Sequence, residues 1–375
     1  MKILLTGGGS GGHFYPIIAI AQSIFEICKT QKLLDPEIIF MSDNPFNERM
    51  LFDNGIRFKK APAGKRRLYS SSSNLFDIPK TIIGCIKAVF LLFEMYPDVV
   101  FCKGGYGSFP AVFAARLLRI PVVIHESDTV PGRVNAWAAG FATKIAITFP
   151  ETSDYFKKKD IALTGTPIRK ELLTPVKSGA FEFFDLKSDI PTVLVLGGSQ
   201  GAQIVNEVVL DALPELVNNF QIIHQTGKAN IDYVAQTASV ELEKSEFKNR
   251  YKPIDYLDDL TMRNAVGAAS LIISRAGASA ISEIAVWGIP SILIPISESN
   301  GDHQRKNAFA YNRVGACTVI EESNLSAHIL ISELYTILQT PGRYEKMHEA
   351  ALSFGKNDAA DKIARVLIDI ALSHQ

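Results

Sequence analysis

Glu283, Gln304 and Asn307 are side chains whose types and spacing suit a sugar nucleotide. Glu283 lies one turn inside a helix predicted from about Ser279, after an apolar strand (271–273) and a tight turn through Gly277. A carboxylate accepts hydrogen bonds from ribose hydroxyls, and free N–H groups at a helix start can meet an anion. Gln304 and Asn307 are three residues apart, so their amides share one helical face and can bind sugar hydroxyls. An ordinary strand–helix–strand unit with a solvated loop explains the pattern equally well.

A glycine-rich loop near the N-terminus carries a second candidate group, the imidazole of His13. Gly7, Gly9 and Gly12 match the dinucleotide fingerprint between a strand predicted over 2–6 and a helix predicted over 16–27. A histidine beside such a loop can act as a general base, or can simply cap the helix. Asp43 ends the second predicted strand, so an NAD-dependent dehydrogenase is one alternative. Its spacing is longer than the about 20 residues expected of that fingerprint.

Glycine loops recur after predicted strands throughout the chain. Loops at 103–108 and 197–201 each lie between a strand and a helix, and the second repeats the opening of the chain. Alternating strands and helices predict parallel sheets whose ligands bind at the strands' carboxyl ends. The chain is therefore expected to be α/β, with two nucleotide-type halves. An irregular linker is predicted over 177–190, and an amphipathic helix over 358–372.

Composition excludes some classes of protein. Lys+Arg and Asp+Glu are equal at 39 each, which argues against a nucleic-acid-binding protein. The four cysteines have no metal or redox spacing, and the N-terminus has no export signal. The segment 78–96 is strongly apolar, but Pro79, Lys80 and Lys87 make a membrane span unlikely. A helix buried for most of its length is the favoured interpretation, with a membrane-surface patch at its start left open.

A departing diphosphate would need stabilisation of its developing charge. The chain contains no Asp-x-Asp sequence, the usual acidic pair for a metal. Backbone N–H groups at 198–201, the Ser199 hydroxyl and Arg169 are the groups expected to replace the metal. No metal or other cofactor is therefore expected, and His13 is the candidate base for an attacking hydroxyl.

In combination, these motifs resemble the MurG family, the glycosyltransferases of family 28. The residues that carry the resemblance are Gly7–His13 with Pro16, Gly104-Gly105-Tyr106, His125-Glu126, 166–169, 197–201 with Asn206, 275–283, and Asp302-His303-Gln304 with Asn307. It covers essentially the whole chain. It implies the GT-B fold, two Rossmann-like doubly wound parallel-sheet domains facing a cleft, at 1–165 and 166–355. Residues 356–375 would form a helix crossing back to the first domain.

The resemblance also implies an activity and a set of site residues. The family transfers N-acetylglucosamine from UDP-N-acetylglucosamine to the 4-hydroxyl of undecaprenyl-diphosphoryl-N-acetylmuramoyl pentapeptide (lipid I), making lipid II for peptidoglycan. His13 would be the catalytic base. The donor-binding residues would be Ser10, Gly11, Gly12, Asp128, Arg169, Ser199, Gln200, Leu257, Arg275, Gly277, Ala278, Ser279, Glu283, Gln304 and Asn307. The acceptor-binding residues would be Gly104, Gly105, Tyr106 and His125.

The same resemblance implies a peripheral protein on the cytoplasmic side of the cell membrane, with the region 78–90 touching the membrane and cell-wall synthesis enzymes as possible partners. One departure from the commoner family pattern follows His125-Glu126, where Ser127-Asp128 replace Gln-Asn. The motifs are also compatible with a glycolipid transferase acting on diacylglycerol, with a UDP-N-acetylglucosamine epimerase, and with a nucleotide-sensing module that has no activity.

Overall fold

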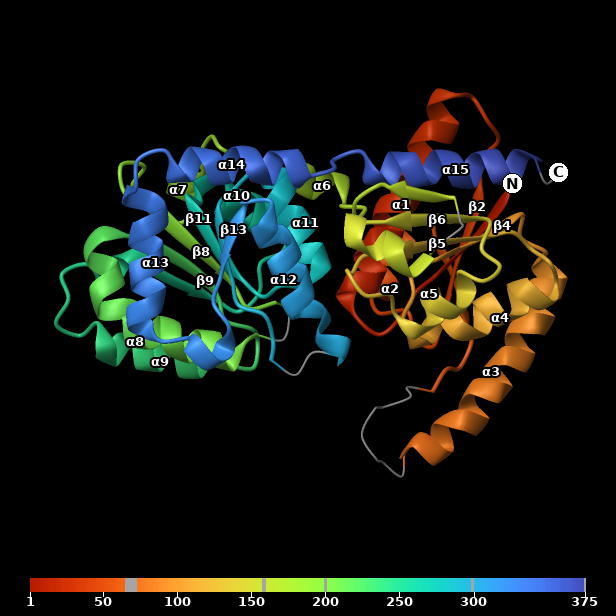
Figure 1. Ribbon diagram of the computed structural model, residues 1–375, viewed down its shortest axis with the longest axis horizontal. Coiled ribbons are helices and arrows are strands. Elements are labelled where there is room, and N and C mark those ends of the chain that lie inside the picture. The colour runs from red at the N-terminus through yellow and green to blue at the C-terminus, as the bar shows by residue number, and fades with distance from the viewer. Residues whose placement is uncertain (65–72, 157–159, 199–200, 298–299, 374–375) are drawn as a thin grey trace. The chain divides into compact units, whose positions relative to one another are not determined.

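The computed structural model describes residues 1–64, 73–156, 160–198, 201–297 and 300–373. The chain forms two compact units. Unit 1 contains Met1–Arg169 together with Lys356–Gln375, and unit 2 contains Lys170–Gly355. Each unit is a parallel β-sheet covered by helices (Figure 1).

Unit 1 has a seven-stranded parallel sheet in the order β3-β2-β1-β4-β5-β6-β7. Its strands are β1 (Lys2–Thr6), β2 (Glu37–Ser42), β3 (Arg57–Lys60), β4 (Val99–Cys102), β5 (Val122–Glu126), β6 (Lys144–Ile147) and β7 (Ile161–Leu163). Its helices are α1 (Gly11–Thr30), α2 (Glu48–Asp53), α3 (Ser73–Met95), α4 (Phe109–Leu117), α5 (Arg133–Ala138) and α15 (Ala359–Ser373), with 3₁₀ turns η1 (Tyr106–Ser108) and η2 (Pro150–Phe156).

Unit 2 has a six-stranded parallel sheet in the order β10-β9-β8-β11-β12-β13. Its strands are β8 (Thr192–Leu196), β9 (Gln221–Gln225), β10 (Tyr251–Ile254), β11 (Leu271–Ser274), β12 (Ser291–Leu293) and β13 (Cys317–Val319). Its helices are α6 (Lys170–Leu173), α7 (Ala180–Phe183), α8 (Gln203–Asn219), α9 (Ile231–Glu241), α10 (Asp259–Ala268), α11 (Ala278–Trp287), α12 (His303–Arg313), α13 (Ala327–Gln339) and α14 (Arg343–Phe354), with 3₁₀ turns η3 (Lys248–Arg250), η4 (Asn300–Asp302) and η5 (Glu322–Asn324).

The central strands of both sheets are apolar runs because both of their faces are covered. Every residue of β4, β8 and β11 is buried, as expected for parallel strands between two helical layers. In each unit the order of the strands reverses next to the first strand, β1 or β8, which is where α/β folds bind ligands. The predicted pair of doubly wound parallel sheets is thus confirmed.

The C-terminal helix α15 completes the core of unit 1. Ile363, Leu367, Ile368 and Ala371 lie on one face and are buried in the cluster that contains Ile3. This helix also lies alongside α1. The last segment of the chain therefore packs on the first strand and helix of the same unit, and its amphipathic pattern reflects that burial.

Helix α3 differs from its predicted burial. Its described residues leave a row of large apolar side chains exposed, and Ala88 and Leu92 face inward. The exposed side chains are Ile78, Ile82, Ile83, Ile86, Phe90 and Phe93. The interpretation of a helix buried for most of its length is wrong, because only one narrow face packs, chiefly against α4 (Figure 1). Among the described residues, none of the helices is long and apolar enough to cross a membrane.

Three predicted boundaries also need correction. Helix α1 starts at Gly11, so His13 lies in its first turn and not in the preceding loop. The segment 177–190 is not an irregular linker throughout, because α7 forms within it and packs against α10. The sequence predicts a helix over 202–213, whereas α8 continues through Pro214 to Asn219.

Candidate active site

The two glycine loops of unit 1 pack directly against each other. An ideal Cβ placed on Gly105 would lie 2.4 Å from the Gly8 carbonyl oxygen, and one placed on Gly8 would lie 2.8 Å from Gly107 Cα. The ring of Tyr106 covers Gly9, where an added Cβ would lie 2.9 Å from Tyr106 Cε1. Side chains at these positions would force the loops apart. The fold therefore brings Gly8 and Gly9 into contact with the segment 105–107.

His13 lies half-buried in the first turn of α1, which follows this loop. Its Nδ1 is 3.0 Å from Ser10 Oγ, and its backbone N–H donates to the Ser10 carbonyl at 3.1 Å. Gly11 and Gly12 occupy the first two positions of the helix. A ring whose Nδ1–H donates to Ser10 presents Nε2 as the basic nitrogen. Ser10 is thus placed to set the tautomer that a general base requires.

His125 and Glu126 close β5, behind the glycine loops. His125 is completely buried, and its Nε2 contacts the Gly165 carbonyl at 2.9 Å. Burial holds the pKa of His125 well below its usual value, with the nearby Lys103 ammonium acting in the same direction. The imidazole is therefore neutral and faces the protein interior. This placement favours a role in supporting the loop over direct contact with a ligand.

Arg169 and Asp128 occupy different places at the edge of unit 1. The Arg169 guanidinium is stacked over the Tyr15 ring, with Cζ 4.3 Å from the centroid, and only 8% of the residue is exposed. Asp128 follows β5, and its backbone N–H donates to Glu126 at 3.1 Å. Because Tyr15 is two residues beyond His13, its stacked cation lies near the first turn of α1.

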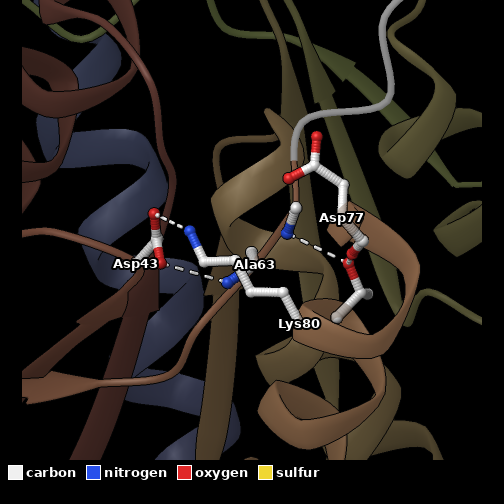
Figure 2. Close-up of polar contacts among 6 residues, drawn as sticks. Asp43, Ala63, Asp77 and Lys80 are labelled. Carbon is white, nitrogen blue, oxygen red and sulfur yellow. Dashed lines mark hydrogen bonds and ion pairs between the residues drawn. The ribbon is translucent and has the colours of Figure 1, made fainter. Parts of the chain in front are cut away.

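Asp43, the candidate ribose-binding acid, contributes instead to local structure. One oxygen accepts from Lys80 Nζ at 3.0 Å and the other from the Ala63 N–H at 3.2 Å (Figure 2). Beside this pair, the Gly64 N–H donates to the Thr81 hydroxyl at 3.0 Å. The carboxylate thus fixes the start of α3 to the segment after β3. Its engagement weakens the dehydrogenase alternative.

In unit 2 the candidate nucleotide loop joins β11 to α11. Gly277 precedes the helix with φ −67°, a value open to any residue, and an added Cβ would contact nothing within 4 Å. Neither the backbone nor the packing therefore requires glycine there. Ala278 and Ser279 form the first helical turn, and Glu283 lies half-buried one turn further on. Open space above a helix N-terminus suits an anionic ligand.

Arg275 in this loop is already paired. Its Nη1 lies 2.7 Å from Glu322 Oε1 and donates to the Ile294 carbonyl at 3.1 Å, while its Nε has no hydrogen-bond partner. Glu322 also accepts from the N–H of Ser297 at 2.9 Å and from its hydroxyl at 2.5 Å. Burial raises the pKa of Glu322, but these bonds outweigh it and leave that pKa below its usual value. The carboxylate therefore links the loops that follow β11 and β12.

Gln304 and Asn307 lie in the first turns of α12, as their spacing predicts. Gln304 Oε1 accepts from the Ile296 N–H at 3.2 Å. Asn307 is fully buried, and its Nδ2 donates to the Ala276 carbonyl at 3.4 Å. Asn307 therefore braces the nucleotide loop. Leu257 is also buried, at 3% exposure, and the predicted residues Ser199 and Gln200 lie outside the described part of the chain.

Sequence reasoning missed two charged residues of these loops. Lys103 is buried beneath the glycine loops of unit 1, and Glu322 holds Arg275 in unit 2. A cation between an apolar strand and a Gly-Gly pair was the available signal for Lys103. No signal in the sequence pointed to Glu322, because its partner Arg275 is 47 positions away.

Comparisons with known proteins define the class to which this fold and these loops belong. The family model for the glycosyltransferase family 28 N-terminal domain matches residues 3–147, and that for the family 28 C-terminal domain matches residues 192–363. The chain belongs to glycosyltransferase family 28 and is a hexosyltransferase with the GT-B fold.

Relatives narrow the class further. A protein of Thermodesulfovibrio yellowstonii is 36% identical, over 98% of both chains, and one of Lachnoclostridium phytofermentans is 37% identical, over 99% of both. Both are named UDP-N-acetylglucosamine–N-acetylmuramyl-(pentapeptide) pyrophosphoryl-undecaprenol N-acetylglucosamine transferase. The crystal structure of Acinetobacter baumannii MurG shares the fold, with a TM-score of 0.74 and 24% identity over 98% of this chain and 99% of that one.

Proposed function

We propose that this enzyme transfers N-acetylglucosamine from UDP-N-acetylglucosamine to the 4-hydroxyl of lipid I, producing lipid II for peptidoglycan. The observation that carries the proposal is the 36% identity to a transferase of that name over 98% of both chains. The site geometry agrees with it: a base at a glycine-lined loop in unit 1, and an open helix N-terminus beside a carboxylate in unit 2.

The uridine part of the donor is assigned to the loops of unit 2, whereas two of the residues assigned to its diphosphate and sugar side, Arg169 and Asp128, belong to unit 1. Glu283 would accept hydrogen bonds from the ribose hydroxyls, and the N–H groups at Gly277, Ala278 and Ser279 would face the nucleotide. Gln304 would bind the sugar hydroxyls, Leu257 the uracil, and Asn307 would hold the loop through Ala276. Ser199, Gln200, Arg169 and Asp128 are assigned to the diphosphate and sugar side of the donor.

The acceptor is assigned to the paired glycine loops of unit 1. Gly104, Gly105 and Tyr106 would contact it, and His125 would hold the segment at Gly165 in the same unit. His13 Nε2 would take the proton of the 4-hydroxyl as its oxygen bonds to the anomeric carbon. The bond from that carbon to the diphosphate oxygen breaks in the same displacement, so the configuration inverts. The released UDP carries away the electron pair, and backbone N–H groups stabilise its charge.

Membrane association is assigned to α3. Its exposed apolar row runs beside Lys80 and Lys87, and such a face suits the boundary of an anionic bilayer. We infer a peripheral enzyme on the cytoplasmic face of the membrane, in reach of lipid I and of other cell-wall enzymes. Ile83→Glu with Phe90→Glu should abolish co-flotation with phosphatidylglycerol vesicles. Phe52→Glu, at a residue 84% exposed on α2, is the matched control and should still float. Equal flotation of both variants would refute the assignment to α3.

A donor and acceptor panel tests the proposed function. Purified enzyme should form lipid II only from UDP-N-acetylglucosamine and lipid I, and should do so in the presence of EDTA, because no metal is assigned a role. Transfer to diacylglycerol would indicate a glycolipid transferase. Isomerisation of UDP-N-acetylglucosamine without any acceptor would indicate an epimerase. The Neisseria meningitidis UDP-N-acetylglucosamine 2-epimerase has a similar fold, with a TM-score of 0.67 at 16% identity. Loss of lipid II formation with EDTA would refute the metal-free step.

A further inference from the structure

A lysine side chain is buried beneath the glycine loops of unit 1. Lys103 follows β4 directly, and only 1% of the residue is exposed. Its backbone N–H donates to the Thr6 carbonyl at 2.8 Å, and an ideal Cβ on Gly7 would lie 3.3 Å from Lys103 Cβ. Lysines are almost never fully buried unless they are paired. The position therefore requires a specific partner.

The partner is the segment that ends β5. Lys103 Nζ donates to Ser127 Oγ at 2.9 Å, and the carboxylates of Glu126 and Asp128 flank this serine in the sequence. Burial lowers the pKa of Lys103, whereas Glu126, Asp128 and the neighbouring Cys102 raise it. Burial likewise raises the pKa of Glu126, and Lys103 opposes that change. Each charge makes the burial of the other tolerable.

Glu126 also holds the segment 126–132 that follows β5. Its carboxylate accepts from Asn135 Nδ2 at 3.0 Å, from the Gly132 N–H at 2.9 Å and from the Asp128 N–H at 3.1 Å. One carboxylate thus defines the path of the segment 126–132. Lys103 connects that path to Gly104 and Gly105, whose φ values of +90° and +82° fix the loop over Gly8.

We propose that Lys103 is a positioning residue for the lipid acceptor. It acts through Ser127 and Glu126 to hold the acceptor loop 104–106 and the segment 126–132 in one arrangement. The inference rests on the proposed function, which assigns the acceptor to unit 1.

Lys103→Met tests this role, because methionine keeps the length of the side chain and removes its charge. Lys144→Met is the matched control, since Lys144 belongs to the same unit and forms an exposed pair with Asp160. We expect kcat/KM for lipid I to fall about tenfold or more in Lys103→Met. The Kd for UDP should stay within about twofold, because the loops assigned to the uridine belong to unit 2. Lys144→Met should change neither quantity.

Two further variants separate positioning from damage to the fold. Lys103→Met with Glu126→Gln removes both charges and should recover part of the lost kcat/KM for lipid I. Ser127→Ala removes only the hydrogen bond and should reduce kcat/KM for lipid I by about fivefold, again without affecting UDP. It supplies the test if Lys103→Met does not fold.

The outcomes distinguish this inference from the proposed function. A parent enzyme that does not use lipid I overturns the proposed function. If the parent uses lipid I, and Ser127→Ala and a folded Lys103→Met have the same kcat/KM for lipid I as the parent, only the role of Lys103 is overturned. Equal losses in acceptor kinetics and UDP binding would also overturn it, because they would indicate general destabilisation.

Discussion

The glycine loops of unit 1 and the β11–α11 loop of unit 2 differ in what requires their glycines. In unit 1, Gly8, Gly105 and Gly107 are in such close contact that any Cβ would meet backbone atoms. In unit 2, Gly277 has an ordinary φ and open space where a side chain would point. The first set is explained by loop–loop packing alone. The second has no explanation within the chain, so it is the stronger indication of a ligand.

The two units also differ in how deeply the charged side chains near these loops are buried. The loops of unit 1 cover the fully buried Lys103 and Glu126, while the nucleotide loop of unit 2 keeps Arg275 and Glu322 at 15% and 16% side-chain exposure. A buried pair fixes one arrangement, because separating its charges is costly. A partly exposed arginine keeps some of its donors for an incoming anion. A rigid acceptor loop and a more adaptable donor loop are what this difference predicts.

The largest expected effect belongs to His13. His13→Ala should lower kcat by about 100- to 10,000-fold, the range for loss of a general base. The Kd for UDP, measured by calorimetry, should not change, because the nucleotide is assigned to unit 2. An unchanged kcat would show that His13 is not the base. A higher Kd for UDP would contradict the assignment of the nucleotide to unit 2.

Alanine at Gly105 and at Gly277 tests the comparison directly. Gly105→Ala should reduce the free energy of unfolding by about 3 kcal/mol or more, through positive φ and overlap with Gly8. Gly277→Ala should leave the free energy of unfolding within about 0.5 kcal/mol, because its Cβ enters open space, but should weaken UDP binding. Urea unfolding and UDP titration measure both. Similar stability losses in the two variants would show that the two loops do not differ.

Glu283→Ala should weaken UDP binding by about 10- to 100-fold, the value of a charge-assisted hydrogen bond to the ribose. The KM for lipid I should remain near that of the parent. Glu345→Ala on α14, in the first turn of an outer helix of the same unit, is the control. Unaltered UDP affinity in Glu283→Ala would contradict the assignment of the donor to this loop.

Acid should weaken both units, because each buries a histidine whose pKa is lowered, His125 in unit 1 and His224 in unit 2. His224, fully buried on β9 between Tyr251 and Asn206, has its pKa lowered to about 3 by burial. Below about pH 6.5, His224 takes up a proton in the unfolded chain but not in the folded one, so the free energy of unfolding decreases as the pH falls. The loss from His224 is about 2 kcal/mol at pH 5. Urea unfolding of His224→Gln at pH 7.5 and pH 5 should show a smaller pH dependence than the parent; an identical dependence would contradict this.

The order of strands, helices and glycine loops could be predicted from the sequence, because buried parallel strands are apolar runs and their ligand-side turns require glycine. β1, β8 and β9 have the bounds that the sequence predicts, 2–6, 192–196 and 221–225. The exposure of α3 could not be predicted in this way. Its apolar composition fits burial or a membrane surface equally well, and only the position of α4 decides which face is covered.

The sequence by itself determined which residue types form the candidate site, namely His13, Glu283, Gln304 and Asn307, because their chemistry and local spacing can be read directly from it. The tertiary structure decided which of their groups face inward. It buried Asn307 and His125, and it paired Arg275 with Glu322 and Lys103 with Ser127. These partners lie 24 to 47 positions apart. The parallel sheets bring them together, because β4 and β5, and likewise β11 and β13, end at the same edge of their sheet.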